Sequence, residues 1–387
     1  MDTDADPATV SADAPRTATA ATAATTATPA AQLTAPPMRR QLGGRAKAKR
    51  RLLTLFSGGD AFAYAAAAPE THGEWTVVGG SEKPTMWNLV ELWEEEHDAK
   101  IIGTYEQVCA ALERGDLDLG TLDAVVATPP CQDYASVNTD AAGASGPTGK
   151  YFADLPRFVR LIRRRHTVKA FVVEEVTGVE ATPAFQDLMD TFRATNHWTA
   201  WGDVQFWLAG VATTRTRLGM VAAHAPAMKK PGPFALPGLL EAGAQIPEMP
   251  TLEPLLENPG DVDESLREPR DLMDMLGPEH QQSALPARQL GRMRGRGTNR
   301  FVYSVRAPAL VMRANTARAE GLGGVTGLYL DAIGPRRLTP TEVLRLHGFP
   351  TRLAGKLPPL TVYHIVGNSV PVQWAAAVLN LLHELLQ

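Results

Sequence analysis

The fold is organised around residues 122–134, which read LDAVVATPPCQDY. The first part is short, apolar and β-branched without polar alternation, which is typical of a strand buried inside a parallel sheet. Two prolines cannot continue the hydrogen-bond ladder, so the chain turns there with little freedom. Cys131 then follows at the carboxyl end of the strand, where open α/β sheets bind their ligands. A thiol held rigidly there is positioned for nucleophilic attack.

The alternative is that Cys131 is an inert packing residue, as most cysteines are. Cys109 fits that description, because it lies in the amphipathic helical pattern of residues 105–112. Cys131 fits it less well, since prolines precede it and the polar residues Gln132 and Asp133 follow it. The local pattern leaves a reactive role and a packing role about equally open.

Composition limits the classes of protein that the chain can be. Its 387 residues are 44% hydrophobic, enough for one large core or two smaller ones. Two cysteines exclude a disulfide framework and a zinc cluster, so we expect no metal and a reducing cytoplasm. The net charge of −4 gives no global basic field, although a local basic stripe suffices for nucleic acid. No apolar run approaches a membrane span and no secretion signal is visible, so we expect no membrane contact.

The N-terminal residues 1–50 differ in composition from the rest. Up to about residue 38 they are alanine, threonine, proline and aspartate, which cannot offset the entropy of ordering and predict a disordered tail. A basic run follows at residues 39–51. We favour a solvated linker there, and the alternative is an arm that contacts phosphates.

Strand and helix patterns alternate along the next part of the chain. The predicted strands are 52–56, 75–79, 101–104, 122–128, 170–176, 204–208 and 218–222, and the predicted helices are 61–68, 84–96, 105–112, 151–165 and 183–194. This order predicts an α/β fold with a doubly wound, Rossmann-like mixed sheet and right-handed crossovers.

After residue 223 the regular alternation ends. Residues 225–330 predict a second, small, irregular domain that contains an arginine- and glycine-rich run. Helices return at 339–347 and 371–386. We therefore expect a main domain at 51–224, and residues 331–387 complete it.

The predicted strand ends carry polar groups that suit a cofactor. Gly58 and Gly59 form a turn before a helix, and Glu82 ends the second strand, where an acid binds ribose in nucleotide-binding folds. Each signal is weak alone, but their order favours an adenosine-type cofactor. No lysine and serine or threonine pair follows the glycines, which excludes a P-loop.

Glu174, Arg215 and Arg217 complete the candidate chemistry. Glu174 ends the strand beside that of Cys131, and a thiolate facing a carboxylic acid suits addition to a conjugated ring. The alternative for Glu174 is a solvated turn. The two arginines alternate along a strand, either as a solvated face or to bind a phosphate or base carbonyl. Residues 367–371 read GNSVP, which caps a helix and also offers donors to a ligand.

Five ordered motifs in residues 52–224 and 335–387 resemble those of the cytosine-C5 DNA methyltransferases. They are PPCQ at 129–132, VEEV at 173–176, TTRTR at 213–217, RLTPTE at 337–342 with LHGFP at 346–350, and GNSV at 367–370. The resemblance implies the S-adenosylmethionine-dependent methyltransferase fold, with residues 225–330 as a target-recognition domain.

The resemblance also implies the site residues. Cys131 would attack C6 of a flipped cytosine, Glu174 would bind N3 and the exocyclic amine, and Arg217 with Arg215 would contact the base carbonyl and nearby backbone. S-adenosylmethionine would contact Phe56, Ser57, Gly58, Gly59, Asp60, Glu82, Lys83, Thr104, Pro130, Asn368, Ser369 and Val370. Duplex DNA would contact Gln132, Arg292, Arg294, Arg296 and Arg300.

Four departures from the family pattern leave alternative functions open. Asp60 stands where a glycine is usual, Glu175 replaces the asparagine of Glu-Asn-Val, Thr213 replaces a glutamine, and Thr104 replaces an acid that meets adenine. Alternatives to a plain DNA methyltransferase are therefore a pyrimidine-C5 alkyltransferase with a modified donor or base, an RNA cytosine-C5 methyltransferase and a weakly active DNA-binding homologue.

The expected setting is the cytoplasm of a bacterial or phage-infected cell. The protein would act as a monomer on double-stranded DNA and associate with the nucleoid when bound. A restriction endonuclease is a candidate partner, as in restriction–modification systems.

Overall fold

The computed structural model describes residues 48–84, 89–135, 141–239, 248–275, 289–293, 301–310 and 327–387. The chain separates into two compact units, Met1–Ala46 and Lys47–Gln387, and every described residue belongs to the second.

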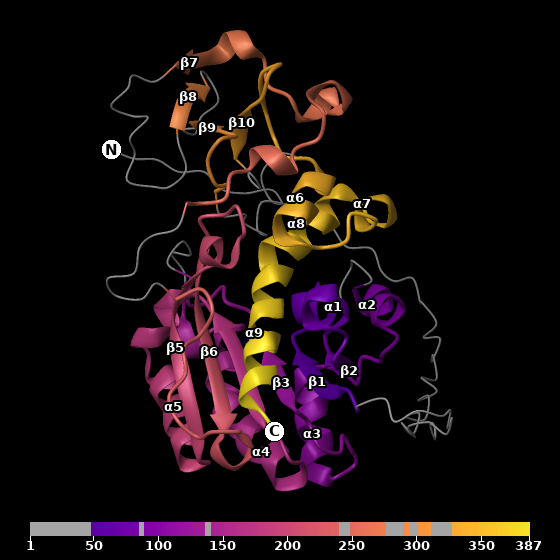
Figure 1. The fold of residues 1–387 in the computed structure, drawn as a ribbon, viewed down its shortest axis with the longest axis vertical. Helices are drawn as coiled ribbons and strands as arrows, with labels where there is room; N and C mark the ends of the chain where they lie inside the picture. The colour runs from indigo at the N-terminus through magenta and orange to yellow at the C-terminus, as the bar shows by residue number, and fades with distance from the viewer. Residues whose placement is uncertain are drawn as a thin grey trace, which may run out of the picture. The chain divides into compact units, whose positions relative to one another are not determined.

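Six strands form a mixed sheet in the order β2-β1-β3-β4-β6-β5 (Figure 1). They are β1 (Arg50–Leu55), β2 (Trp75–Ser81), β3 (Ala124–Ala127), β4 (Ala170–Glu175), β5 (His197–Gln205) and β6 (Thr216–His224). The first four pair in parallel, whereas β6 runs antiparallel to both β4 and β5. The predicted α/β fold with a doubly wound mixed sheet is confirmed.

Helices cover both faces of this sheet (Figure 1). One face packs against α1 (Ala61–Ala67) and α9 (Val372–Leu385), and the other against α3 (Tyr105–Arg114), α4 (Gly149–Arg165) and α5 (Pro183–Ala194). In β3, Ala124 and Val126 join the first core, while Val125 and Ala127 join the second. Alternate side chains of one strand therefore enter different apolar layers, which explains its unbroken apolar sequence.

The predicted strand at 101–104 is wrong. Ile101 makes a single bridge to Gly80, and the chain then bends at Gly103, whose φ is +126°. Thr104 caps α3, since its side chain accepts from the Gln107 backbone and the Gln107 side chain accepts from Thr104 N–H. The capping box sets the start of the helix and leaves no room for a longer strand.

The basic run at 39–51 is described only at its end. Arg50 and Arg51 belong to β1, and both bind the Asp123 carboxylate, Arg50 through its side chain and Arg51 through its backbone N–H. These two residues are therefore part of the sheet, and neither a linker nor a phosphate-binding arm.

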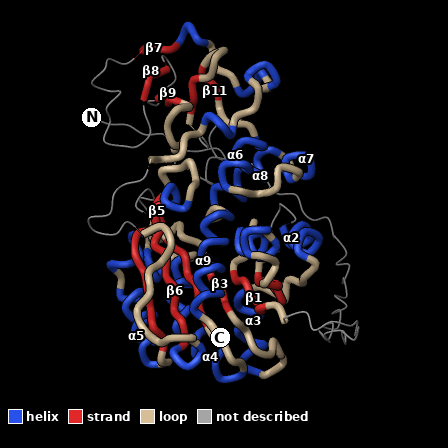
Figure 2. The backbone as a smooth tube through the Cα atoms, in the orientation of Figure 1, coloured by secondary structure: helices blue, strands red, loops and turns tan. Residues whose placement is uncertain are grey.

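A second sheet of five strands lies in the later part of the chain, in the order β11-β10-β9-β8-β7. The strands are β7 (Met273–Met275), β8 (Gln289–Met293), β9 (Phe301–Ser304), β10 (Leu328–Leu330) and β11 (Pro335–Arg336). They are short and alternate with loops (Figure 2). Tyr303 and Tyr329 of this sheet share one apolar core with Trp374 of α9, so the two sheets are joined through buried side chains.

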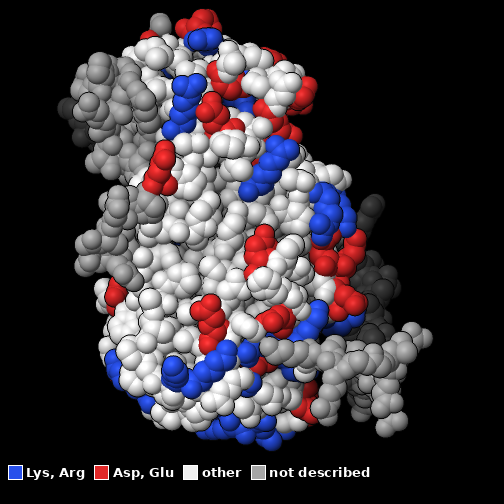
Figure 3. Space-filling view, viewed as in Figure 1, with Lys and Arg blue, Asp and Glu red and all other residues white. Residues whose placement is uncertain are grey.

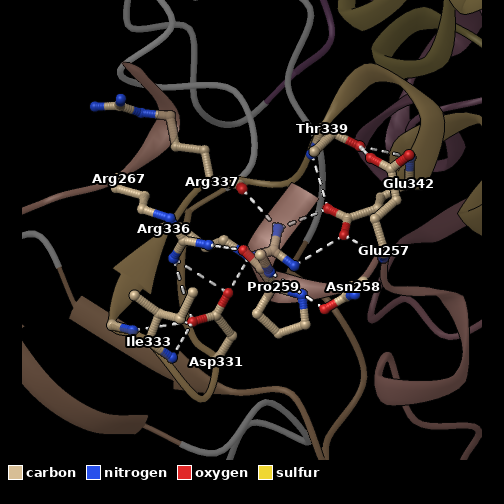
Figure 4. A network of polar contacts seen from close by, with 12 residues as sticks. Glu257, Asn258, Pro259, Arg267, Asp331, Ile333, Arg336, Arg337, Thr339 and Glu342 are labelled. Atoms are coloured by element: carbon tan, nitrogen blue, oxygen red, sulfur yellow. Dashed lines mark hydrogen bonds and ion pairs between the residues drawn. The ribbon is translucent and has the colours of Figure 1, made fainter. Parts of the chain in front are cut away.

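A buried polar network anchors the second sheet to α6 (Pro340–His347) (Figure 4). The Arg336 guanidinium donates to both Glu342 carboxylate oxygens at 2.7 and 2.8 Å, and to Asp331 at 2.6 Å. Glu342 also accepts from the backbone N–H groups of Thr339 and Glu257, both at 2.8 Å. Because Glu342 is fully buried, these donors replace the water that would otherwise bind its carboxylate.

Residues 359–385 are long and apolar enough to span a membrane, which the sequence prediction overlooked. This stretch comprises α8 (Pro359–Asn368) and α9, and 67% of its most apolar window is buried inside the protein. Trp374, Leu379 and Leu382 pack into the core, so the stretch matches the core helix of a globular protein.

Candidate active site

One cavity of about 480 Å³ lies at the carboxyl ends of β1 to β4. Its lining contains all of the predicted catalytic and cofactor-binding residues and one predicted DNA contact: Phe56, Ser57, Gly58, Gly59, Asp60, Glu82, Lys83, Thr104, Pro130, Cys131, Gln132, Glu174, Arg215, Arg217, Asn368, Ser369 and Val370. The parallel strands β1 to β4 end at one edge of the sheet, which brings these distant segments together.

The loop after β3 holds Cys131 at the cavity wall. The Tyr134 backbone N–H donates to the Cys131 carbonyl at 3.0 Å and closes a turn. Asp133 accepts from the backbone N–H groups of Thr148 and Gly149 at 2.7 and 2.9 Å, which ties this turn to the start of α4. Burial and the charge of Glu175 raise the pKa of the Cys131 thiol to about 11, so the thiol needs a proton acceptor when it reacts.

Glu174 and Arg217 form a buried ion pair at the same wall. Glu174 pairs with Gly219 across β4 and β6, and Arg217 Nε lies 3.2 Å from Glu174 Oε1. Burial raises the pKa of Glu174, while Arg217 and Arg215 oppose that shift. The Glu174 carboxyl group can therefore donate a proton or a hydrogen bond to a polar ring that binds in the cavity.

Arg215 links this wall to the last turn of α8. Its Nη1 donates to the Gly367 carbonyl at 2.7 Å, one residue before Asn368. Burial and the neighbouring Arg217 lower the pKa of Arg215 to about 9. His347 lies near both guanidinium groups, and burial followed by their charges lowers its pKa well below the usual value, which keeps the ring neutral.

The glycine loop after β1 also lines the cavity. Gly58 has a φ of +49°, and its N–H donates to Glu82 at 2.8 Å, which joins the ends of β1 and β2. Burial raises the pKa of Glu82, while the backbone N–H groups that donate to its carboxylate oppose the shift. A Cβ on Gly59 would lie 2.2 Å from Ile365 Cγ2 and 3.0 Å from Ser369 Oγ, so only glycine allows α8 to approach this closely.

Asp60 lines the cavity, but its carboxylate is bound by neighbouring residues. Its carboxylate accepts from Thr54 Oγ1 at 2.6 Å, Trp93 Nε1 at 2.8 Å and Ala63 N at 2.9 Å. The residue is 6% exposed, and burial raises its pKa. Asp60 therefore caps α1 and binds its neighbours, and little of its side chain is exposed.

Three aromatic rings lie beside the loop, and the sequence prediction found only one of them. Phe56 stacks on Tyr105 with ring centroids 4.9 Å apart and meets Tyr151 edge-on at 5.4 Å. Thr104, which precedes Tyr105, uses its side chain to cap α3. Tyr105 could have been noticed as the neighbour of that cap, whereas no local signal marks Tyr151.

The predicted DNA contacts are only partly described. Arg292 is exposed on β8, and Arg294, Arg296 and Arg300 lie outside the described residues. Gln132 lines the cavity beside Cys131. Among the described residues, no group of three or more histidine, cysteine, aspartate or glutamate side chains is placed to hold a metal ion.

Solved structures with a similar fold include two methyltransferases and a DNMT2 protein. The Entamoeba histolytica methyltransferase EhMeth superposes with a TM-score of 0.60 and 15% identity over 87% of this chain and 99% of its own. Dnmt2 of S. pombe superposes with a TM-score of 0.59 and 16% identity over 87% of this chain and 98% of its own. DNMT2 of Spodoptera frugiperda superposes with a TM-score of 0.57 and 16% identity over 87% of this chain and 100% of its own. At this identity the likeness concerns the fold. The sequence matches no curated protein.

The sequence also matches the family model for C-5 cytosine-specific DNA methylase over residues 55–384. The chain therefore belongs to that family and is a divergent methyltransferase of the cytosine-C5 class.

Proposed function

We propose that the protein is a DNA cytosine-C5 methyltransferase that uses S-adenosylmethionine and forms a covalent adduct between Cys131 and its target base. The observation that carries this proposal is that one cavity is lined by Glu82 and Phe56, which follow β2 and β1, and by Cys131 and Glu174, which lie after β3 and on the neighbouring β4. A cofactor and a base held in it would be in contact.

The cofactor half has groups that fit an adenosine with a charged tail. The cavity volume of about 480 Å³ lies within the range of small-molecule sites. Phe56 and Tyr105 offer an apolar surface for adenine, and Glu82 can accept hydrogen bonds from ribose hydroxyls. Asn368 and Ser369 add polar groups. When bound, S-adenosylmethionine supplies the methyl group.

The base half has groups that fit a flipped cytosine. Cys131 attacks C6, and Glu174 donates a proton to N3 as the ring accepts electrons, while the carboxyl also binds the exocyclic amine. Arg217 holds Glu174 in place and, with Arg215, contacts the base carbonyl. After C5 is methylated, water accepts the C5 proton and the sulfur leaves.

Duplex DNA is favoured over RNA because residues 225–330 form a sizeable insertion whose sequence carries an arginine-rich run, and such a run supplies candidates for groove and phosphate contacts. On the face drawn in Figure 3, lysine and arginine side chains are interspersed with aspartate and glutamate, consistent with the net charge of −4. Binding would therefore depend on local basic groups such as Arg292 on β8.

The test is mass spectrometry of nucleosides from duplex DNA and from tRNA, each incubated with the protein and S-adenosylmethionine. We expect 5-methylcytosine in the DNA and none in the tRNA. Methylation of tRNA alone would favour an RNA enzyme, and a heavier pyrimidine from cell-derived DNA would favour a modified donor or base. No product with any acceptor would favour a DNA-binding homologue.

A further inference from the structure

Asp60 is a buried acid in the glycine loop, residues 56–60, and the proposed methyl transfer assigns its side chain no task. Its backbone has a φ of +46°, a left-handed conformation that is unfavourable for a residue with a Cβ. The Asp60 N–H donates to the Ser57 carbonyl at 2.6 Å and closes a turn over residues 57–60. The turn therefore has a backbone shape that its sequence does not favour, and contacts outside the turn must hold it.

Three donors hold the Asp60 carboxylate. Thr54 Oγ1 on β1 donates to Oδ2 at 2.6 Å, and the Ala63 backbone N–H in α1 donates to Oδ1 at 2.9 Å. The third donor is Trp93 Nε1, which lies 2.8 Å from Oδ2 and belongs to α2 (Leu89–His97). The carboxylate thus ties the turn to the strand before it, to the helix after it and to a helix that is distant in sequence.

Trp93 also packs against the glycine loop. A Cβ on Gly80 of β2 would lie 2.8 Å from Trp93 Cζ2 and 2.8 Å from Ser57 Oγ, so the indole ring and the loop meet at this glycine. The Ser57 N–H donates to the carbonyl of Ser81, the next residue of β2, at 3.0 Å. The loop is therefore in contact with both β2 and the Trp93 ring, and Trp93 is itself buried.

Helix α2 is anchored independently of the loop, so Trp93 offers the loop a fixed point. Glu96, one turn after Trp93, has a side chain that is only 3% exposed. Its carboxylate accepts from the Arg352 guanidinium, and from Lys356 Nζ at 2.8 Å at the end of α7 (Leu353–Lys356). Tyr64 Oη of α1 donates to the same carboxylate at 3.3 Å. These contacts fix the end of α2 against two other helices.

We propose that Asp60, through its hydrogen bond to Trp93, is a positioning residue that holds the glycine loop in the shape that binds S-adenosylmethionine. This inference rests on the proposed function. Every residue of the loop lines the cavity. A loop that is already ordered loses less conformational entropy when a ligand binds, so the tie raises cofactor affinity. The Asp60 side chain acts through the loop, and the chemistry at the base does not depend on it.

The first test is calorimetric titration with S-adenosylhomocysteine. Asp60→Asn cannot keep all three hydrogen bonds, because either orientation of the amide turns its NH₂ group toward a donor. Trp93→Phe keeps an aromatic ring and the cap of α1 but removes one donor. Each variant should bind about 5-fold more weakly, and the double variant should lose less than the product of the two single effects.

Two substitutions at the other end of the sheet are matched controls. Trp75→Phe removes a buried indole N–H that has no hydrogen-bond partner among the described residues, and Asp123→Asn alters a buried acid before β3. Both controls should bind with unchanged affinity. Trp93→Phe tests the tie even if Asp60→Asn fails to fold, and an unchanged affinity in Trp93→Phe would overturn the inference. No binding by the unsubstituted protein would instead overturn the proposed function.

The second test needs neither DNA nor cofactor. Hydrogen–deuterium exchange, followed by peptide mass spectrometry, reports how often the amides of the glycine loop open. In Trp93→Phe the loop amides should exchange about 5-fold faster, while peptides from β3 and β4 keep their rates. Trp75→Phe should leave the loop amides unchanged. Equal exchange of the loop amides in Trp93→Phe and in the unsubstituted protein would overturn the inference.

Steady-state kinetics on duplex DNA separates positioning from chemistry. Trp93→Phe should raise the KM for S-adenosylmethionine about 5-fold and leave kcat within about twofold, because the loop affects binding of the cofactor and not the groups at the base. A lower kcat with an unchanged KM for the cofactor would overturn the inference.

Discussion

The Nε atom of Arg217 lies 3.2 Å from Oε1 of Glu174, and both side chains are largely buried at the wall of the cavity. The pair joins β6 to β4, so the antiparallel strand supplies the cation for an acid on the parallel part of the sheet. This relationship holds Glu174 in one orientation toward the cavity, which is what recognition of a planar ring requires.

Glu174→Gln should slow covalent trapping on 5-fluorocytosine DNA by about 10²-fold or more, because the amide cannot donate a proton to the ring. Rapid-quench trapping measures the rate. Glu180→Gln, which replaces an exposed glutamate six residues later, should trap at the unsubstituted rate. A full-rate Glu174→Gln protein would remove Glu174 from the proposed chemistry.

Cys131→Ser should abolish the trapped adduct, because a serine hydroxyl gives no effective nucleophile in place of the thiol. Denaturing gel electrophoresis detects the adduct. Cys109→Ser is the matched control, since Cys109 is buried in α3 among the second core. Adduct formation by Cys131→Ser at the normal rate would end the covalent mechanism.

Glu175→Gln should stabilise the protein increasingly as the pH rises. The pKa of Glu175 is raised from 4.5 to about 8 by burial, so folding favours its neutral form. The resulting stability is fully present below about pH 4.5 and is lost as the pH rises through 8, by up to about 5 kcal/mol. Urea unfolding at pH 5 and 8.5 measures the gap in the free energy of unfolding between the variant and the unsubstituted protein. A gap that does not widen contradicts this expectation.

Gly59→Ala should weaken cofactor binding, because its Cβ would lie 2.2 Å from Ile365 Cγ2. Overpacking of this kind costs about 1–3 kcal/mol, and the displaced loop lines the cavity. Calorimetric titration with S-adenosylhomocysteine measures the affinity. Gly232→Ala, with no atom within 4 Å of the added Cβ, should bind normally, and Ile365→Ala should restore part of the loss in Gly59→Ala.

Glu342→Ala should destabilise the protein by about 3–5 kcal/mol, because Arg336 would keep a buried charge without its main partner. Thermal unfolding measures the effect. Glu264→Ala removes an exposed glutamate that lies 3.7 Å from Arg267 and should change stability by less than about 1 kcal/mol. Equal effects of the two substitutions would show that the network in Figure 4 is not a strong anchor.

Local patterns predicted most strands of the main sheet, because buried parallel strands and amphipathic helices have distinct periods. The strand predicted at 204–208 was misplaced, since β5 is His197–Gln205 and Phe206–Ala209 form a 3-10 helix. The strand predicted at residues 101–104 was wrong, since the capping box of Thr104 outweighed two isoleucines. The convergence of Cys131 and Glu174 followed from one topological rule, that parallel strands end at the same edge.

The sequence by itself determined the class of fold, the order of the motifs and the cavity residues at the strand ends, because these depend on short-range patterns. Only the tertiary structure decided that Asp60 binds Trp93, and that Tyr151 meets Phe56. It alone also showed that Glu175 is buried at the end of β4. Such pairings join residues far apart in the chain, and their geometry depends on how whole strands and helices pack together.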